Sequence, residues 1–339
     1  MRGVSKDGAN RMSSFEARLR SHLRMTTAPD FAMTDRDNED IPFNRHFPLK
    51  PGVVEEVVPG VRRVLCDNPS PMTMSGTVSY IVGRGKVAII DPGPDDEAHA
   101  KALLDAVRGE TVTHILVTHT HRDHSPNAAR IKAATGAPIY AEGEHRAARP
   151  YYDSEKMSSE AGADRDFKPD ITVRDGEIIS GSGWALEVVA TPGHTANHIA
   201  FAWPERGVNF VGDHVMGWSS SVVVPPDGSM IEYMASLHKL AARDEQLYFS
   251  GHGPEVPDAP RFARFLIRHR QAREASILHR LAKGETDIPT MVRAIYIGID
   301  PRLAGAAGYS VLAHLEDLVA RGIVITDGDP VIGGSYRLA

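Results

Sequence analysis

Short β-branched runs alternate with turn signals over residues 53–91. The runs read VVEEVV, VRRVLC, VSYIVG and KVAIID, and Pro-Gly, Asn-Pro-Ser-Pro and Gly-Arg-Gly separate them. Runs of this length between turn residues are typical of strands joined by hairpins. The fold is therefore predicted to open with an antiparallel sheet.

The hydrophobic period changes after Asp91. The run DDEAHAKALLDAVRG places apolar residues at helical spacing and ends on Gly, and the apolar strand THILVTH follows it. The segments SPNAARIKAATG and PIYAEG repeat this order, and a second strand-rich block follows, with ITVRDGEIIS, WALEVVAT and HIAFAWPERGVNFVGD. Two hairpin-rich halves with helices between them predict an α+β fold, in which two sheets pack face to face as a four-layer αββα sandwich.

The pattern of hydrophobic and polar residues changes again from Pro260. A long helix is predicted for PRFARFLIRHRQAREASILHRLAKG, which has Pro at its start and Gly past its end. Two more helical runs, TDIPTMVRAIY and AAGYSVLAHLEDLVARG, precede two β runs around Asp-Gly-Asp-Pro. This is the order of a winged helix. The predicted organisation is a polar leader of low order over residues 1–50, a main domain over 51–258, and a linker helix with a winged-helix domain over 259–339.

The composition limits the class of protein and its expected location in the cell. The 339 residues are 42% hydrophobic and 24% charged, which is typical of a globular protein. No apolar run approaches the ~18 residues of a membrane span, and the N-terminus lacks the apolar centre of a secretory signal. Asp7 and Glu16 interrupt a faint likeness to a transit peptide. The single cysteine, Cys66, cannot form an internal disulfide, so a cytoplasmic location is predicted.

The stretch THTHRDHS concentrates metal-capable side chains in one loop. His119, His121, Asp123 and His124 lie between a predicted strand and a predicted helix, with Ser125 as the helix N-cap. With 16 histidines in the chain, chance pairs are expected, and a lone His would more often be a satisfied polar residue. Three His and one Asp at this spacing indicate a metal site instead.

Four ligands cannot complete two coordination shells, so later strand ends should supply more. His194, Asp213 and His252 each follow a predicted strand. His198 and His214 are the competing neighbours, and a supporting or surface role is favoured for both.

With these residues the chain resembles the metallo-β-lactamase-fold hydrolases over about residues 53–255. The resemblance implies a dinuclear metal centre with a bridging hydroxide as nucleophile. Zinc suits the nitrogen-rich ligands best, although Mn or Fe also fits. The seven implied ligands are His119, His121 and His194 for one metal, Asp123, His124 and His252 for the other, and Asp213 between them.

The same resemblance assigns roles beyond coordination. Asp91, at the end of the strand IIDPG, would orient a metal-bound histidine. From the chemistry of a two-metal site, and not from the resemblance, Asp123 is expected to hold the hydroxide and accept its proton, and His198 or a nearby group is expected to serve the leaving group.

Two stretches are similar to the lactamase-beta-like protein 2 type. They are DNPSPMTMSGTVSYIVG near the start and the winged-helix tail, which runs from HRQAREASIL to GYSVLAHLEDLVARGIV. The family includes single-strand-preferring endoribonucleases and enzymes that cleave carrier-protein thioesters, so both substrates stay open. The bridging position holds Asp213 where the commonest zinc β-lactamases have Cys, which argues against an antibiotic-degrading enzyme. The 39 residues from Asp213 to His252 leave no room for an inserted nuclease cap.

Charge bears on the choice of substrate. The net charge of −6 argues against a globally basic nucleic-acid-binding surface. A row of arginines on the long helix could bind phosphates without sequence preference, but solvated arginines are equally common on long helices. Aromatic residues able to stack bases are few in the tail. The row comprises Arg261, Arg264, Arg268, Arg270 and Arg273.

Two other functions are left as alternatives. One is a glyoxalase II-like hydroxyacyl-thioester hydrolase, which the winged tail disfavours. The other is a metal-dependent nucleic-acid-binding regulator without turnover. The wing could also act as a lid or as the contact of a homodimer, and no membrane partner is expected.

Overall fold

The computed structural model describes residues 42–155 and 162–339. Most of the predicted leader therefore lies outside the described residues. Its last part, residues 42–50, has no helix or strand, yet Phe43, Phe47 and Leu49 pack against the core. Within the described part of the chain, no helix has both the length and the apolar character needed to cross a membrane.

The first sheet has seven strands in the order β1-β2-β3-β4-β5-β6-β7. Neighbours from β1 to β4 are antiparallel, as the hairpin pattern predicts, and those from β4 to β7 are parallel. The strands are β1 Val54–Val58, β2 Val61–Leu65, β3 Val78–Arg84, β4 Lys86–Ile90, β5 Thr111–Leu116, β6 Ile139–Ala141 and β7 Ile171–Thr172.

The second sheet has six strands in the order β13-β12-β11-β10-β9-β8. Its neighbours are antiparallel except β11 and β12, which run parallel because α4 connects them. The strands are β8 Ile178–Gly181, β9 Trp184–Ala190, β10 Ile199–Trp203, β11 Val208–Gly212, β12 Leu247–Ser250 and β13 Val256–Pro257.

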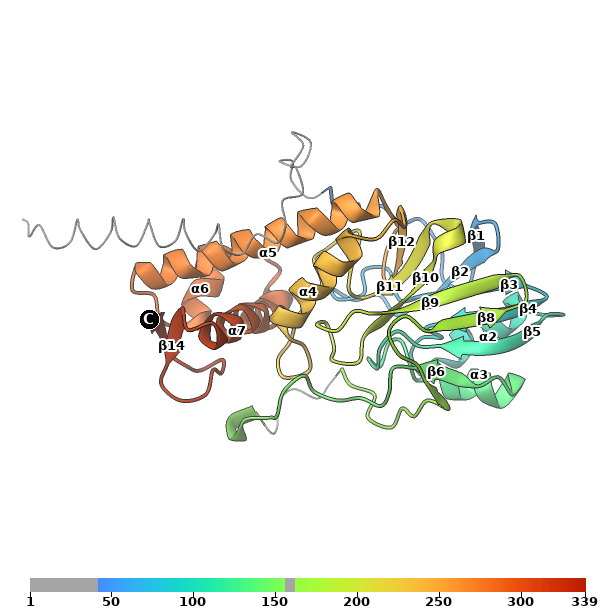
Figure 1. Ribbon diagram of the computed structural model, residues 1–339, viewed down its shortest axis with the longest axis horizontal. Helices are drawn as coiled ribbons and strands as arrows, with labels where there is room; N and C mark the ends of the chain where they lie inside the picture. Colours follow the sequence, from blue (N-terminus) through green and yellow to red (C-terminus); the bar gives the residue numbers. More distant parts are fainter. Residues whose placement is uncertain (1–41, 156–161) are drawn as a thin grey trace, which may run out of the picture. The chain divides into compact units, whose positions relative to one another are not determined.

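Three hydrophobic layers confirm the predicted αββα order (Figure 1). The central layer joins the two sheets, with Tyr80 of β3 meeting Phe210 of β11 at a ring distance of 5.2 Å. An outer layer packs α2 (Glu97–Ala106) and α3 (Asn127–Thr135) on the first sheet. The other packs α4 (Met230–Ala241) and α5 (Ala259–Ala282) on the second. Central strands such as β10 are buried on both faces for this reason.

The C-terminal part has the predicted order of helix, helix, helix and hairpin. Helix α5 contacts α4 and β13 at one end and α6 and β15 at the other, so it joins the sandwich to the winged helix (Figure 1). The remaining elements are α6 Ile288–Ile295, α7 Ala304–Ala320, β14 Val324–Thr326 and β15 Tyr336–Leu338, with the short 3₁₀ turns η2 Asp153–Glu155, η3 Pro204–Arg206 and η4 Pro301–Leu303.

Candidate metal centre

One group of imidazoles forms at the loop that follows β5. His119 Nε2 lies 3.1 Å from His121 Nδ1, and His194 Nε2, from the loop after β9, lies 3.0 Å from the same atom. Three ring nitrogens from two loops therefore converge on one point. The loop itself differs from expectation in one detail. Ser125 does not cap α3; its Oγ bonds Asp164 Oδ2 at 2.6 Å instead.

A second group lies beside the first. His252 Nε2, from the loop after β12, is 3.3 Å from His124 Nε2 and 3.2 Å from Asp123 Oδ2. Asp213, at the end of β11, lies between the groups: its Oδ1 is 3.4 Å from His124 Nε2 and its Oδ2 is 3.7 Å from His194 Nε2. The structure thus brings all seven predicted ligands together.

The donor set fits divalent cations because of where the ring protons must lie. His194 Nδ1 is 2.6 Å from the carbonyl of Val222, and His252 Nδ1 is 3.2 Å from that of Gly76. A carbonyl only accepts, so each Nδ1 carries a proton and each Nε2 is the nitrogen left to bind a cation. A cation at the point where these ligand atoms converge would accept their lone pairs together. Asp213 Oδ1 is also buried without a hydrogen-bond donor among the described residues.

Burial and neighbouring charges shift the pKa values of the two groups of ligands in different directions. Burial lowers the pKa of His119 well below its usual value and that of His121 to about 3, so both imidazoles stay neutral. Burial also opposes charge on His252, but Asp213 and Asp123 outweigh it and raise the His252 pKa to about 9. Burial acts against ionisation of Asp213 too, yet the neighbouring His252 and His124 hold its pKa well below the usual range. The carboxylates are therefore ionised and ready to bind cations.

Asp91 orients the second group from behind. Its Oδ1 accepts from Thr118 N at 2.7 Å, and its Oδ2 accepts from Thr118 Oγ1 at 2.7 Å and lies 3.0 Å from His124 Nδ1. Thr118 Oγ1 in turn lies 3.0 Å from His119 Nδ1. One buried carboxylate therefore fixes a ring from each group.

His198 and His214 lie behind the ligands. His198 Nδ1 is 2.8 Å from Thr191 Oγ1, and its Nε2 accepts from the backbone N–H of Asp213 at 3.3 Å. Both ring nitrogens are engaged, and His198 does not line the cavity at the metal centre. His214 is buried with its ring 4.5 Å from that of Tyr233.

A glycine that the sequence analysis did not single out is needed at this site. A Cβ on Gly251 would lie 2.4 Å from Asp213 Oδ1 and 2.6 Å from His124 Cε1. Only Gly allows the strand end to approach both ligands. The signal was present as the Gly-His-Gly run around His252.

The cavity at the centre measures about 410 Å³. Its walls beyond the ligands are largely apolar, with Met72, Met216, Val222 and Val224. Arg122 is the one Lys or Arg among the described lining residues, and its Nε donates to a backbone carbonyl at 2.9 Å.

The arginines of α5 do not form one exposed row. Arg270 is 3% exposed, and its guanidinium donates to the Ser221 carbonyl and, at 3.2 Å, to Ser310 Oγ. The Arg273 guanidinium lies 4.0 Å from the Tyr296 ring centre. Both side chains therefore have interaction partners within the protein.

Comparison with known proteins extends this picture. Residues 72–252 match the family described as the metallo-beta-lactamase superfamily, and residues 288–334 match the beta-lactamase associated winged helix domain. The chain is 31% identical to the beta-lactamase-like protein 2 homolog of Drosophila melanogaster, over 79% of this chain and 91% of that protein. It is 29% identical to the atrochrysone carboxyl ACP thioesterase of Claviceps purpurea, over 78% of this chain and 76% of that protein.

Two solved structures share the fold. A beta-lactamase domain protein from Burkholderia ambifaria aligns with a TM-score of 0.70 at 22% identity, over 86% of this chain and 97% of that one. A metallo-beta-lactamase family protein from Thermus thermophilus aligns with a TM-score of 0.68 at 24% identity, over 84% of this chain and 100% of that one.

Proposed function

This chain belongs to the metallo-beta-lactamase superfamily of hydrolases and carries the associated winged helix domain, and we propose that the bond it cleaves is an acyl thioester. The hydrolysis would use two divalent cations, of which zinc suits five imidazoles and two carboxylates best.

The apolar wall of the cavity carries the proposal. A single-stranded RNA places a negative phosphate on each side of the scissile bond, and proteins usually meet such phosphates with unpaired Lys and Arg. The cavity wall beyond the ligands is instead largely apolar, with Met72, Met216, Val222 and Val224, and Arg122 is its one Lys or Arg among the described lining residues. An uncharged acyl thioester suits these walls better than a polyanion does.

The leaving group supports the same choice. A thiol has a pKa of about 8.5, so a thiolate departs without a proton donor. An RNA alkoxide is far more basic, closer to hydroxide, whose parent water has a pKa of about 15.7. The sequence offered His198 as a donor, but both of its nitrogens are engaged behind the ligands. We therefore assign His198 to holding the Asp213 backbone and leave the thiolate without a protein acid.

The remaining roles follow from position. The cations would supply a Lewis acid for the carbonyl oxygen and a water ionised near neutral pH. Asp123, whose side chain is 28% exposed at the cavity, would accept the proton of the attacking water. The water oxygen bonds to the carbonyl carbon, the carbon–sulfur bond breaks and the sulfur leaves with the bonding pair. The name thioesterase on two fungal relatives agrees with this reaction.

Parallel assays test the proposal. We expect the zinc-loaded protein to hydrolyse acyl thioesters of N-acetylcysteamine, with metal content measured on the same sample, and to leave single-stranded RNA uncut. Weak turnover of S-lactoylglutathione should separate it from a glyoxalase II-like enzyme. Cleavage of RNA with thioesters untouched would replace the proposal with a nuclease function. RNA binding without cleavage would instead favour the regulator.

Ligand variants link the activity to this centre. Asp123→Ala and His194→Ala should each lower turnover by at least a thousand-fold with little change in circular dichroism. His238→Ala, at an exposed histidine of α4, is the matched control and should keep full activity. Equal turnover in all three variants would place the activity elsewhere.

A further inference from the structure

A second cavity of about 580 Å³ adjoins the metal centre. Met72, Met216 and Val222 line both cavities, so the two hollows share walls. We infer that this second cavity receives the acyl part of the substrate and that the acyl group is bulky and apolar. The inference rests on the proposed thioester hydrolysis.

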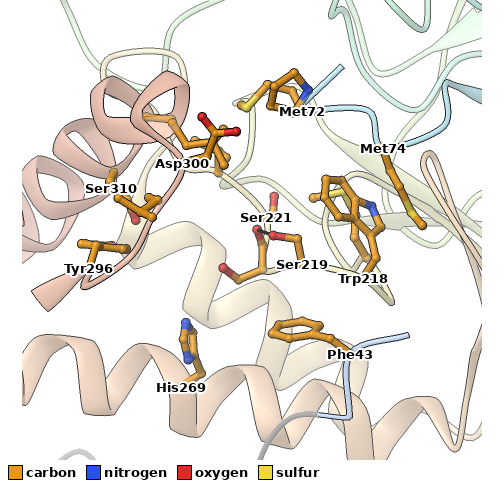
Figure 2. Close-up of a pocket in the computed structure, with 18 of the residues that line it drawn as sticks. Phe43, Met72, Met74, Trp218, Ser219, Ser221, His269, Tyr296, Asp300 and Ser310 are labelled. Carbon is orange, nitrogen blue, oxygen red and sulfur yellow. Dashed lines mark hydrogen bonds between the residues drawn. The ribbon is translucent and has the colours of Figure 1, made fainter. Parts of the chain in front are cut away.

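The cavity lies where the sandwich meets the winged helix. Figure 2 shows Met74, Trp218 and Phe43 on one side of it and Tyr296 and Ser310 on the other. The first three belong to loops and the N-terminal segment of the sandwich, whereas the last two belong to the helical domain. The winged helix therefore completes a binding site that the sandwich alone leaves open.

One wall is packed directly onto the metal centre. Trp218 contacts Gly253, the residue after the ligand His252, so closely that a Cβ there would lie 2.7 Å from Trp218 Cδ1. A group that lies against this indole is thus close to the loop that carries the ligand His252.

The lining suits an apolar group with flat faces. Thioethers and aromatic rings pack well against aromatic and alicyclic groups. They line the cavity together with aliphatic side chains and with several arginines and serines, and the cavity volume falls in the range of about 300–1,000 Å³ typical of small-molecule sites. The apolar lining is formed mainly by Met72, Met74, Trp218, Tyr296, Ile299 and Leu303.

Charged leaving groups fit the cavity poorly. The phosphates of a nucleotide-bearing thiol would need free cations, but Arg302 forms an ion pair with Asp300 at 2.7 Å. Arg270 and Arg273 are likewise held, by Ser221 and by the Tyr296 ring. Arg45, which is exposed, is the one lining arginine that has no partner among the described residues, and one cation does not match several phosphates. The cavity is therefore assigned to the acyl side of the bond and not to the thiol side.

The acyl series tests this directly. Acetyl, hexanoyl and 2-naphthoyl thioesters of N-acetylcysteamine share one leaving group, so their kcat/KM values compare acyl groups alone. Burying one methylene corresponds to about a four-fold gain. We expect kcat/KM to rise by at least a hundred-fold from acetyl to hexanoyl, with naphthoyl as good or better. A flat series with good turnover would overturn the cavity assignment while the proposed function stands.

Substitutions that fill the cavity provide a second test of the assignment. Ala306 of α7 lines the cavity and is half-buried, whereas Ala304 on the same helix is exposed. Ala306→Phe should lower kcat/KM for the naphthoyl thioester by at least ten-fold and leave the acetyl thioester within two-fold, and Ala304→Phe should change neither. Ile299→Asp, in the loop between α6 and η4, places a charge in the same cavity and should act like Ala306→Phe.

A binding measurement without turnover separates the cavity assignment from the proposed thioester hydrolysis. The thioether S-(2-naphthoylmethyl)-N-acetylcysteamine cannot be hydrolysed, and calorimetric titration of the zinc-loaded full chain measures its affinity. Binding that Ala306→Phe weakens ten-fold supports the cavity even if no thioester is hydrolysed. Equal affinity in the wild type and Ala306→Phe would refute the assignment.

Discussion

Replacing Asp91 by Asn should weaken metal binding while the fold survives. Asp91 adopts a left-handed backbone with φ of 47°, which Asn tolerates at least as well as Asp. The amide oxygen can still accept from Thr118 N, now at 2.7 Å. The amide NH₂, however, faces His124 Nδ1, which lies 3.0 Å from the present carboxylate oxygen. Two N–H groups then oppose each other unless His124 moves its proton to Nε2, the nitrogen that binds metal.

The size of the effect follows from this tautomer conflict. Losing the partner that anchors a metal-bound histidine typically costs about 10–100-fold in metal affinity. This equals about 1.4–2.8 kcal/mol at 1.4 kcal/mol per ten-fold. Asp91→Ala should cost the metal-free fold more than Asn does, because Thr118 N–H is then buried without an acceptor, at about 1–3 kcal/mol.

Chelator competition measures the zinc affinity, and urea unfolding of the metal-free protein measures the fold. Asp95→Asn is the matched control, because Asp95 is 71% exposed in the same loop and pairs with Arg130 at the surface. Wild-type zinc affinity in Asp91→Asn would show that the carboxylate does not fix the His124 tautomer, and the reasoning would fail.

Three more outcomes are expected. Removing metal should lower the melting temperature, and zinc at about 100 times its Kd should restore about 2.7 kcal/mol, whereas a zinc-independent melting curve would contradict the site. Arg270→Met should lower the free energy of unfolding by about 2–4 kcal/mol, since the Ser221 carbonyl and Ser310 hydroxyl lose a charged donor; a change below ~0.5 kcal/mol in urea titration would contradict it. Burial, with help from Arg270 and Arg273, lowers the pKa of His269 to about 4, so the unfolded chain takes up this proton first as pH falls from 6.5. The stability that depends on neutral His269 is therefore fully present above pH 6.5 and is lost toward pH 4. His269→Gln should flatten this part of the curve of unfolding free energy against pH. An unchanged slope would show that this ring does not contribute.

The seven ligands were predictable because each follows the end of a strand: four follow β5 of the first sheet, and the others follow β9, β11 and β12 of the second. Strand-like runs and turn residues place His194, Asp213 and His252 at strand ends, and the structure adds that these ends meet the loop after β5. The two groupings came from resemblance, and the structure brings the same side chains together. For these seven ligands, the sequence pattern around each residue was therefore enough to select the residues that the fold brings together.

The α5 arginines show where local pattern stops being informative. At about 100° per residue, Arg270 lies on the opposite face of the helix from Arg261, so the spacing already excluded one continuous row. What lies under each face depends on contacts far apart in sequence. Arg270 reaches Ser221 and Ser310, which are 49 and 40 residues away. The same holds for Gly251, whose need for a missing Cβ depends on where Asp213 and His124 arrive.

The linker helix α5 connects the winged helix to the metal centre through one loop, because Arg270 bonds both Ser310 of α7 and Ser221. Arg270 of α5 holds the Ser221 carbonyl, and the next residue, Val222, accepts the hydrogen bond that fixes His194. Ser221 Oγ also lies 3.3 Å from His194 Nδ1. The loop that orients this ligand is thus clamped from the C-terminal side by a buried guanidinium, and the same loop forms a wall of the proposed acyl cavity. An acyl group in the proposed cavity would contact Ser221 and Val222, which both contact His194, so the position of the acyl group and the orientation of this ligand are coupled through one loop.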